Sequence, residues 1–316
     1  MAACHLCGRE TAVTVLADHP RFRVVRCATC TLVFQVTMRA AVNPATLYDN
    51  IYAAQPDAGK ATSPRPRPSP RDKLVLAEVR RAHRQPGNVL DIGCSYGDLV
   101  RAFAQAGWHA FGIDVSQHAV QWAAEQSLNC ARASVESYAP PVRCDAVVMT
   151  HVLEHCAEPL AVLGRIRGWL NPGGTLHIRV PNVDSAVLRR HPSLFRGELK
   201  PFEHLYYFSP ATLQAVLDKA GFSSAATLSG AFGLGSVLNH LLRSRLVLRT
   251  GWQDVSYFTQ PERKSAYRHL KQWYEKTLPL LDGVPWGPAD REIALVAWDK
   301  EGPPPTRAAP ATAGAC

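Results

Sequence analysis

A short apolar segment that leads into a glycine-bearing turn constrains the fold of this chain more than any other feature. Residues 88–92 have the pattern of a buried strand, Gly93 and Gly97 permit a sharp turn, and residues 98–106 have the pattern of a helix. Such a turn lets the backbone approach a ligand, and the start of the helix offers unpaired N–H groups. A plain strand-to-helix turn of another α/β protein remains the alternative.

An acidic residue ends the next predicted strand. That strand covers residues 109–113, and Asp114 follows it, 23 residues after Asp91. Carboxyl ends of parallel strands meet at one edge of a sheet, where an acidic side chain can accept hydrogen bonds from two ribose hydroxyl groups. The glycine spacing is not Gly-x-Gly-x-x-Gly, which weakens the case for a dinucleotide. The pattern therefore predicts a nucleotide-like ligand at this edge.

Helical and strand patterns alternate from residue 72 onward, which is typical of a parallel sheet with helices on both faces. We therefore predict an α/β fold with a doubly wound, Rossmann-like sheet. The predicted elements are a helix ending before Pro86, strand 88–92, helix 98–106, strand 109–113, a helix capped by Ser116, strand 128–133, strand 144–150, helix 160–170, strand 176–180, helix 210–220 and strand 292–298.

Two blocks of the chain resemble the class I S-adenosylmethionine (SAM) methyltransferases. Asp91, Gly93 and Gly97 match the Asp-x-Gly-x-Gly-x-Gly motif I of that family, with Ser95 at the middle glycine. The second block resembles the later part of the same domain and consists of His151-Val152-Leu153-Glu154-His155, Pro172-Gly173-Gly174 and Pro181. The resemblance covers residues 72–181 and implies that the chain binds SAM.

The resemblance also implies which residues bind the cofactor. Asp114 would hold the ribose, Ser134 and Val135 would border the adenine, and Thr150 with His151 would touch the methionine end. The full predicted cofactor set is Asp91, Gly93, Cys94, Gly97, Asp114, Val115, Ser134, Val135, Thr150 and His151.

A histidine-rich segment supplies the candidate catalytic residues. His204 is the preferred general base, because imidazole titrates near neutrality. Its neighbourhood, with Glu203 and Tyr207, resembles the zinc-ribbon-bearing C-methyltransferases of deoxysugar nucleotide biosynthesis, in which Glu-His carries acid/base chemistry. His155 is a further candidate. A structural role for His204, and a metal-binding role for His151 with His155, remain open alternatives.

Four cysteines near the start of the chain have the spacing of a structural zinc site. Cys4-x-x-Cys7 and Cys27-x-x-Cys30 are separated by 19 residues, and each pair can direct two thiolates at one ion. Four sulfur ligands leave no position for a substrate, so we expect the zinc to be structural. A redox Cys-x-x-Cys or plain buried thiols are the alternatives.

The composition suggests how the rest of the chain is organised. The predicted parts are a zinc ribbon at 1–45, a proline-rich linker at 46–71, a methyltransferase domain at 72–300 with lid or insertion material at 184–208 and 231–290, and a disordered tail at 301–316. We see no signal peptide and no apolar run long enough for a membrane span, so we predict a cytoplasmic protein.

We therefore expect a SAM-dependent methyltransferase that acts on a small molecule. The predicted acceptors are a sugar nucleotide, a polysaccharide precursor or another natural-product intermediate. The net charge of +9 and the ribbon leave an RNA methyltransferase as an alternative. However, Met149-Thr150-His151-Val152 is not the Asn/Asp-Pro-Pro-aromatic turn of amino methylation, and Cys156 does not follow a proline. A non-catalytic SAM-binding regulator is the other alternative.

Overall fold

The structure is a computed structural model and describes residues 2–19, 22–37, 69–185, 188–189, 199, 203–226, 292–302 and 305. The chain divides into two compact units. The N-terminal unit comprises Met1–Ala41, Pro181–Thr212 and Leu228–Ile293, and the sheet unit comprises Val42–Val180, Leu213–Thr227 and Ala294–Cys316. The predicted insertion at 231–290, and most of the predicted linker and tail, lie outside the described residues.

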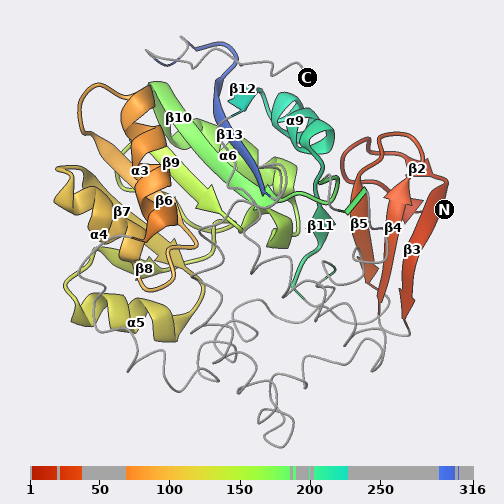
Figure 1. Cartoon of the computed structure of the whole chain (residues 1–316), viewed down its shortest axis with the longest axis horizontal. Coiled ribbons are helices and arrows are strands. Elements are labelled where there is room, and N and C mark those ends of the chain that lie inside the picture. The colour runs from red at the N-terminus through yellow and green to blue at the C-terminus, as the bar shows by residue number, and fades with distance from the viewer. Residues whose placement is uncertain are drawn as a thin grey trace, which may run out of the picture. The chain divides into compact units, whose positions relative to one another are not determined.

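A seven-stranded sheet with the order β12-β13-β10-β9-β6-β7-β8 forms the sheet unit (Figure 1). From β10 to β8 the neighbouring strands are parallel, and β12 is antiparallel to β13. The strands are β6 (Asn88–Ile92), β7 (His109–Asp114), β8 (Cys130–Arg132), β9 (Cys144–Thr150), β10 (Leu170–Pro181), β12 (Phe222–Ala226) and β13 (Glu292–Asp299). Leu90 pairs with Phe111 of β7 and with Val147 of β9, so β6 is a central strand.

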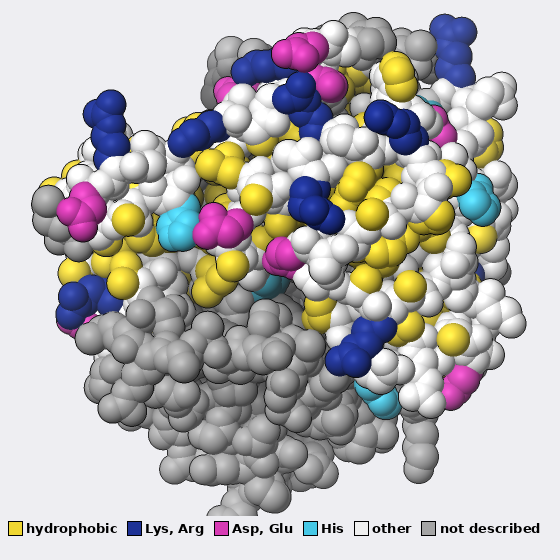
Figure 2. Space-filling model, turned by 180° about the vertical axis from the view of Figure 1, so that it is seen from behind, with side chains coloured by type: hydrophobic (Ala, Val, Ile, Leu, Met, Phe, Trp, Pro, Cys, Tyr) yellow, Lys and Arg dark blue, Asp and Glu magenta, His cyan; other side chains and the backbone are white. Residues whose placement is uncertain are grey.

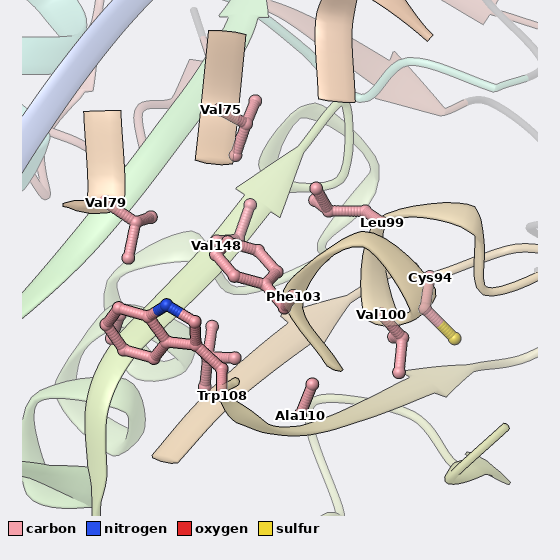
Figure 3. Close-up of a cluster of buried hydrophobic side chains, with 11 residues drawn as sticks. Val75, Val79, Cys94, Leu99, Val100, Phe103, Trp108, Ala110 and Val148 are labelled. Carbon is pink, nitrogen blue, oxygen red and sulfur yellow. The ribbon is translucent and has the colours of Figure 1, made fainter. Parts of the chain in front are cut away.

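Helices cover both faces of this sheet. They are α3 (Pro70–Ala82), α4 (Asp98–Gln105), α5 (Gln117–Glu125), α6 (Pro159–Trp169) and α9 (Pro210–Lys219). Figure 3 shows Val79 of α3 and Phe103 of α4 packed together over Val148 of β9, and all three side chains are buried. Figure 1 shows α6 on the face opposite α3. The predicted doubly wound α/β fold is therefore confirmed. Within the described ranges, none of the helices is long and apolar enough to cross a bilayer.

Helix α3 begins at Pro70, inside the stretch that the sequence assigned to the linker. Ser69 is the reason, because its hydroxyl accepts the N–H of Asp72 at 3.1 Å while its own N–H donates to the carboxylate of Asp72 at 2.8 Å. This reciprocal capping box, followed by proline in the first turn, defines the start of a helix.

Two strands differ from the prediction. Strand β10 begins at Leu170, which pairs with Cys144, and its register shifts before Thr175. The Pro-Gly-Gly segment is thus an irregularity within the strand and includes Gly173 at φ 77°. Strand β12 was not predicted at all, although Phe222 at its start is fully buried.

The N-terminal unit is built from short antiparallel strands. These are β1 (Ala2–Ala3), β2 (Glu10–Thr11), β3 (Val13–His19), β4 (Phe22–Cys27), β5 (Val33–Thr37) and β11 (Tyr206–Tyr207). Strands β1 and β2 pair with each other, and the other four form a sheet of order β11-β5-β4-β3. The core contains Phe22, Val24, Val33, Leu199 and Tyr207. A segment some 170 residues beyond β5 therefore completes this small sheet.

Strand β10 carries a row of buried polar side chains that contact residues of α3 and its C-terminal end. Thr175 Oγ1 lies 2.8 Å from Nε2 of His83 and 2.9 Å from Nε2 of His177. Arg179 forms a buried ion pair with Glu78 of α3. Burial, and then the positive charges of His83 and Arg179, lower the pKa of His177 to about 3. His177 is therefore neutral in the folded protein at ordinary pH.

Candidate active site

The glycine turn between β6 and α4 is held against β7 by backbone hydrogen bonds. The N–H groups of Gly93 and Cys94 both donate to the carbonyl oxygen of Ile113, at 2.8 and 3.0 Å. Gly93 and Gly97 have a φ of 76°, and Ser95 between them has 49°. Glycine adopts such angles readily, whereas for serine they are uncommon. Ser95 therefore keeps this conformation because its surroundings fix it.

Asp114 provides the contact that fixes Ser95. Its Oδ2 accepts a hydrogen bond from the N–H of Ser95, and its Oδ1 accepts one from the N–H of Ser116, both at 2.9 Å. Ser116 in turn caps α5 by accepting the N–H of Ala119 at 3.3 Å. A carboxylate offers about four lone-pair positions, so these two amide contacts are compatible with binding a pair of ligand hydroxyl groups.

Asp91 is a buried carboxyl group just before the turn. It is 5% exposed. Burial, followed by the negative charges of Cys130, Asp72 and Asp114, raises the pKa of Asp91 well above its ordinary value. Burial therefore favours the neutral form of this carboxyl group.

The turn packs closely against its neighbours at two glycines, Gly112 and Gly93, where there is no room for a side chain. A Cβ on Gly112 of β7 would lie 2.6 Å from Cβ of Cys94 and 2.9 Å from Cγ2 of Val100. A Cβ on Gly93 would collide with the side chain of Val152, which follows β9. We did not predict Gly112 as a site residue. A glycine inside an apolar strand was the available signal, because it often marks close backbone approach.

The residues predicted to border the adenine lie next to Asp114. The N–H of Ala133 donates to the carbonyl oxygen of Asp114 at 3.0 Å, and Ser134 and Val135 follow directly. Val135 is buried, and Val115 is the next residue after Asp114. The structure therefore brings these predicted residues to the same edge of the sheet as the glycine turn.

The segment after β9 contains a buried carboxylate between two histidines. Oε1 of Glu154 lies 3.3 Å from Nδ1 of His151 and 3.8 Å from Nε2 of His155, and Glu154 is 1% exposed. Neither Glu154 oxygen, nor Oγ1 of Thr150, has a hydrogen-bond partner among the described residues. His151 has a φ of 55°, and its N–H donates to the carbonyl oxygen of Arg179 at 2.9 Å. Glu154 was not among the predicted site residues.

A family model described as a methyltransferase domain matches residues 69–226, which is half of the chain. The chain belongs to this methyltransferase family. The match includes every predicted cofactor residue of the sheet unit, and it confirms the resemblance to class I SAM-dependent methyltransferases.

Curated relatives of this methyltransferase domain align with part of the chain. A ubiquinone biosynthesis O-methyltransferase of Xanthomonas campestris pv. campestris (strain B100) is 35% identical over 119 residues, covering 35% of this chain and 47% of the relative. A trans-aconitate 2-methyltransferase of Rhodopseudomonas palustris (strain BisB18) is 35% identical over 106 residues, covering 31% and 41%. The chain thus spans about half the length of the curated relatives it matches.

A solved structure with the same fold is that of the 4+2 cyclase SpnF. It aligns over 82% of this chain and 97% of its own length, with a TM-score of 0.50 and 17% identity. This likeness shows the fold alone, because one fold can host unrelated reactions. The methyltransferase assignment therefore rests on the family match.

The predicted catalytic residues Glu203, His204 and Tyr207 belong to the N-terminal unit, whereas the glycine turn belongs to the sheet unit. His204 is 5% exposed, and its ring centroid lies 5.8 Å from that of Tyr207. Tyr207 also packs in the core of the small sheet beside Val33. The burial of Tyr207 indicates that it contributes to the structure. The catalytic roles of Glu203, His204 and Tyr207 stay predictions.

The four predicted metal ligands come together in the N-terminal unit. The Sγ atoms of Cys4 and Cys30 lie 3.4 Å apart, and those of Cys7 and Cys27 lie 3.8 Å apart. All four sulfurs lie within 4.8 Å of one another. Four converging sulfurs are the donor set that structural zinc prefers, so these residues fit the ion.

The two Cys-x-x-Cys turns are equivalent in conformation. Gly8 and Thr31 each follow a pair, with φ of 70° and 63°. The N–H groups of Thr29 and Cys30 both donate to Sγ of Cys27 at 3.4 Å. Burial opposes ionisation of Cys27, but these N–H groups outweigh it and lower the pKa of Cys27 to about 6. Burial raises the pKa of Cys4 and of Cys30, so without a metal the thiolate is favoured at Cys27 and opposed at those two sulfurs.

Charged side chains give little support to a nucleic-acid surface on the face drawn in Figure 2. Lys and Arg of the described residues are dispersed there among Asp and Glu rather than gathered in one patch. Elsewhere in the sequence, Arg23 pairs with Asp18 at 3.1 Å, and Arg167 contacts Asp299 at the same distance.

Proposed function

We propose that this protein is a SAM-dependent methyltransferase that acts on a small-molecule acceptor. The observation that carries the proposal is the carboxylate of Asp114, which the N–H groups of Ser95 and Ser116 orient at the carboxyl end of β7. A carboxylate fixed in this way beside a glycine turn suits the vicinal hydroxyl groups of a ribose. The family match supports methyl transfer as the reaction class.

The other cofactor contacts follow from the site. The backbone of Gly93 to Gly97 would lie against the cofactor. Asp91 would lie near the ammonium group of the methionine moiety, whose charge would counter the burial that raises the pKa of Asp91. Ser134 and Val135 would border the adenine. Thr150 and His151, at the end of β9, would contact the methionine end.

When bound, SAM supplies a methyl group on a positively charged sulfur, which is open to in-line attack by a nucleophile. The protein then has to orient the acceptor, exclude water and remove any proton from the attacking atom. We assign the proton transfer to His204, with Glu203 and Tyr207 beside it in the sequence. His155, next to the buried Glu154, is the second candidate.

We further propose that the acceptor is a sugar nucleotide, a polysaccharide precursor or another natural-product intermediate. The names of the curated relatives, which refer to ubiquinone biosynthesis and trans-aconitate, support a small molecule in general. The segment around Glu203 and His204 resembles deoxysugar C-methyltransferases, which makes a sugar nucleotide one of these candidates. We also propose that Cys4, Cys7, Cys27 and Cys30 hold a structural zinc ion.

Calorimetric titration of the zinc-loaded, full-length protein with SAM and with its demethylated product tests the cofactor site. We expect both to bind, and Asp114→Asn to weaken binding by about tenfold or more, because it removes a charged acceptor. Glu125→Gln, an exposed change at the end of α5, is the matched control and should bind as the wild type does. Absence of binding by the wild type, or unchanged binding by Asp114→Asn, would refute the proposal.

Transfer of a labelled methyl group tests the acceptor class. Sugar nucleotides and bulk cellular RNA are offered in parallel, and label is followed into the small-molecule and the acid-precipitable fractions. We expect label among the small molecules. Label confined to the RNA fraction would instead establish an RNA methyltransferase.

A further inference from the structure

Two cysteines whose thiol groups have no role in the proposed reaction lie at the glycine turn. Cys130 of β8 is the register partner of Gly112 in β7, so the two residues direct their side-chain positions to the same face of the sheet. A Cβ on Gly112 would lie only 2.7 Å from Sγ of Cys94. The sulfur of Cys94 therefore occupies the space above Gly112, next to Cys130.

The sulfur of Cys130 packs against the same turn at Gly97. A Cβ on Gly97 would lie 3.1 Å from Sγ of Cys130, and the N–H of Gly97 donates to the carbonyl oxygen of Cys94 at 2.8 Å. Figure 3 shows the sulfur of Cys94 directed away from Phe103 and the centre of the core. Cys94 is thus part of the turn, and the sulfur of Cys130 lies against the same turn at Gly97.

The pair is electrostatically asymmetric. The side chain of each cysteine is the largest influence on the pKa of the other, raising that of Cys94 and lowering that of Cys130. Cys94 is buried, and Cys130 is partly exposed. Cys130 is therefore the thiol that ionises more readily and that a small oxidant can reach, with Cys94 beside it as the resolving thiol.

We propose that Cys94 and Cys130 form a reversible disulfide when the protein meets hydrogen peroxide, and that this disulfide weakens binding at the glycine turn. The formation of the disulfide does not depend on the proposed function. Its effect on SAM rests on the proposed function.

The chemistry balances with peroxide as the oxidant. The Cys130 thiolate attacks one peroxide oxygen, the O–O bond breaks, and a sulfenic acid and water result. The Cys94 thiol then attacks the Cys130 sulfur, the S–O bond breaks, the sulfenic oxygen leaves as a second water, and the S–S bond forms. Two thiols lose two electrons and two protons, peroxide is reduced, and a dithiol reductant reverses the change.

The disulfide acts on the turn because a bond brings the two sulfurs to about 2.05 Å, well inside their non-bonded contact distance. Cys94 is one residue from Ser95, whose N–H binds Asp114 at 2.9 Å. Movement of Cys94 towards Cys130 therefore displaces the N–H that orients the carboxylate.

Peptide mapping of the full-length, zinc-loaded protein tests the disulfide directly. Trypsin separates the two cysteines, since residues 85–101 contain Cys94 and residues 102–132 contain Cys130, with no other cysteine in either peptide. After brief peroxide treatment and blocking of free thiols, we expect the linked pair 85–101/102–132, which dithiothreitol should resolve. The same link should be missing from Cys130→Ala. It should persist in the matched control Cys144→Ala, which removes a fully buried strand thiol whose pKa burial raises to about 12.

Calorimetry on the same samples tests the coupling. We expect oxidation to weaken SAM binding by about tenfold in the wild type and in Cys144→Ala, and SAM to slow formation of the link in return, because coupling is reciprocal. Cys130→Ala should keep its affinity through peroxide treatment. The proposal is overturned if the linked peptide is absent even at peroxide doses high enough to release zinc. A linked peptide without loss of SAM affinity would overturn the coupling. If the reduced protein fails to bind SAM, the proposed function fails, while the peptide map still decides the disulfide.

Discussion

The N–H of Ser95 and the carboxylate of Asp114, 19 residues apart in the sequence, are joined by a 2.9 Å hydrogen bond. The bond links the glycine turn after β6 to the acidic end of β7. It explains how a serine keeps a φ of 49° where glycine is the usual residue. The same carboxylate also caps the start of α5 through Ser116, so one side chain orders the edge of the sheet where the cofactor is proposed to bind.

Gly97→Ala should destabilise the protein. The φ of 76° disfavours a side chain, and the added Cβ would lie 2.8 Å from Cδ1 of Leu128. We expect a loss of about 1–3 kcal/mol in the free energy of unfolding, together with weaker SAM binding. Urea denaturation and calorimetry measure the two effects.

Gly164→Ala is the matched control for that change. Gly164 lies in α6, and no atom lies within 4 Å of the added Cβ. Alanine has the higher helix propensity, so we expect a gain of about 1 kcal/mol with unchanged SAM binding. Equal effects of the two substitutions on stability would contradict the role assigned to the turn.

Acid should destabilise the sheet unit through His177. Its pKa is about 3 in the folded protein and 6.5 when unperturbed. The unfolded chain therefore binds a proton between these values while the folded protein does not, so stability is lost as pH falls below 6.5. The loss attributable to His177 should reach about 2 kcal/mol at pH 5.

The slope of unfolding free energy against pH checks this expectation. His177→Gln should flatten the slope between pH 4 and 6.5, whereas His109→Gln, at an exposed histidine of β7, should leave it unchanged. A slope that is unaltered in His177→Gln would contradict the assignment.

Removal of zinc should disorder a segment that is remote in the sequence. Strand β11 pairs with β5, so residues 203–208 depend on a sheet whose small core the proposed zinc supports. We expect a chelator to increase amide hydrogen exchange in 203–208 and in β3 to β5. Exchange in β6 is the internal control and should change little. Protection of 203–208 that survives loss of the metal would show that the metal is dispensable for this sheet.

His204→Ala should lower turnover while leaving SAM binding intact. Loss of a general base typically costs about 10²–10⁴ in rate. His5→Ala removes a histidine of the same unit that contacts Tyr206 edge-on, and it should retain activity. Comparison of kcat with the calorimetric SAM affinity distinguishes the outcomes. If His204→Ala retains full turnover, His204 has a structural role and is not the general base.

The order and type of most elements in the sheet unit followed from local patterns. The strand at Asn88–Ile92 and the cap at Ser116 depend on residues that are neighbours in the chain, and the structure has both as predicted. The start of α3 was missed because the capping box of Ser69 and Asp72 lies at the edge of a proline-rich stretch. The irregular start of β10 was missed because pairing of Leu170 with Cys144 is a long-range contact.

The amino-acid sequence by itself determined the methyltransferase-like sheet and the four-cysteine spacing, because these features depend on short motifs and on periodicity. The same motifs predict Asp91 and Asp114 as site carboxylates. Only the tertiary structure decided that Tyr206 and Tyr207 complete the N-terminal sheet, that Gly112 makes room for Cys94, and that Cys130 pairs with Gly112. These contacts join residues far apart in the chain. Their geometry depends on how strands pair, which no local pattern specifies.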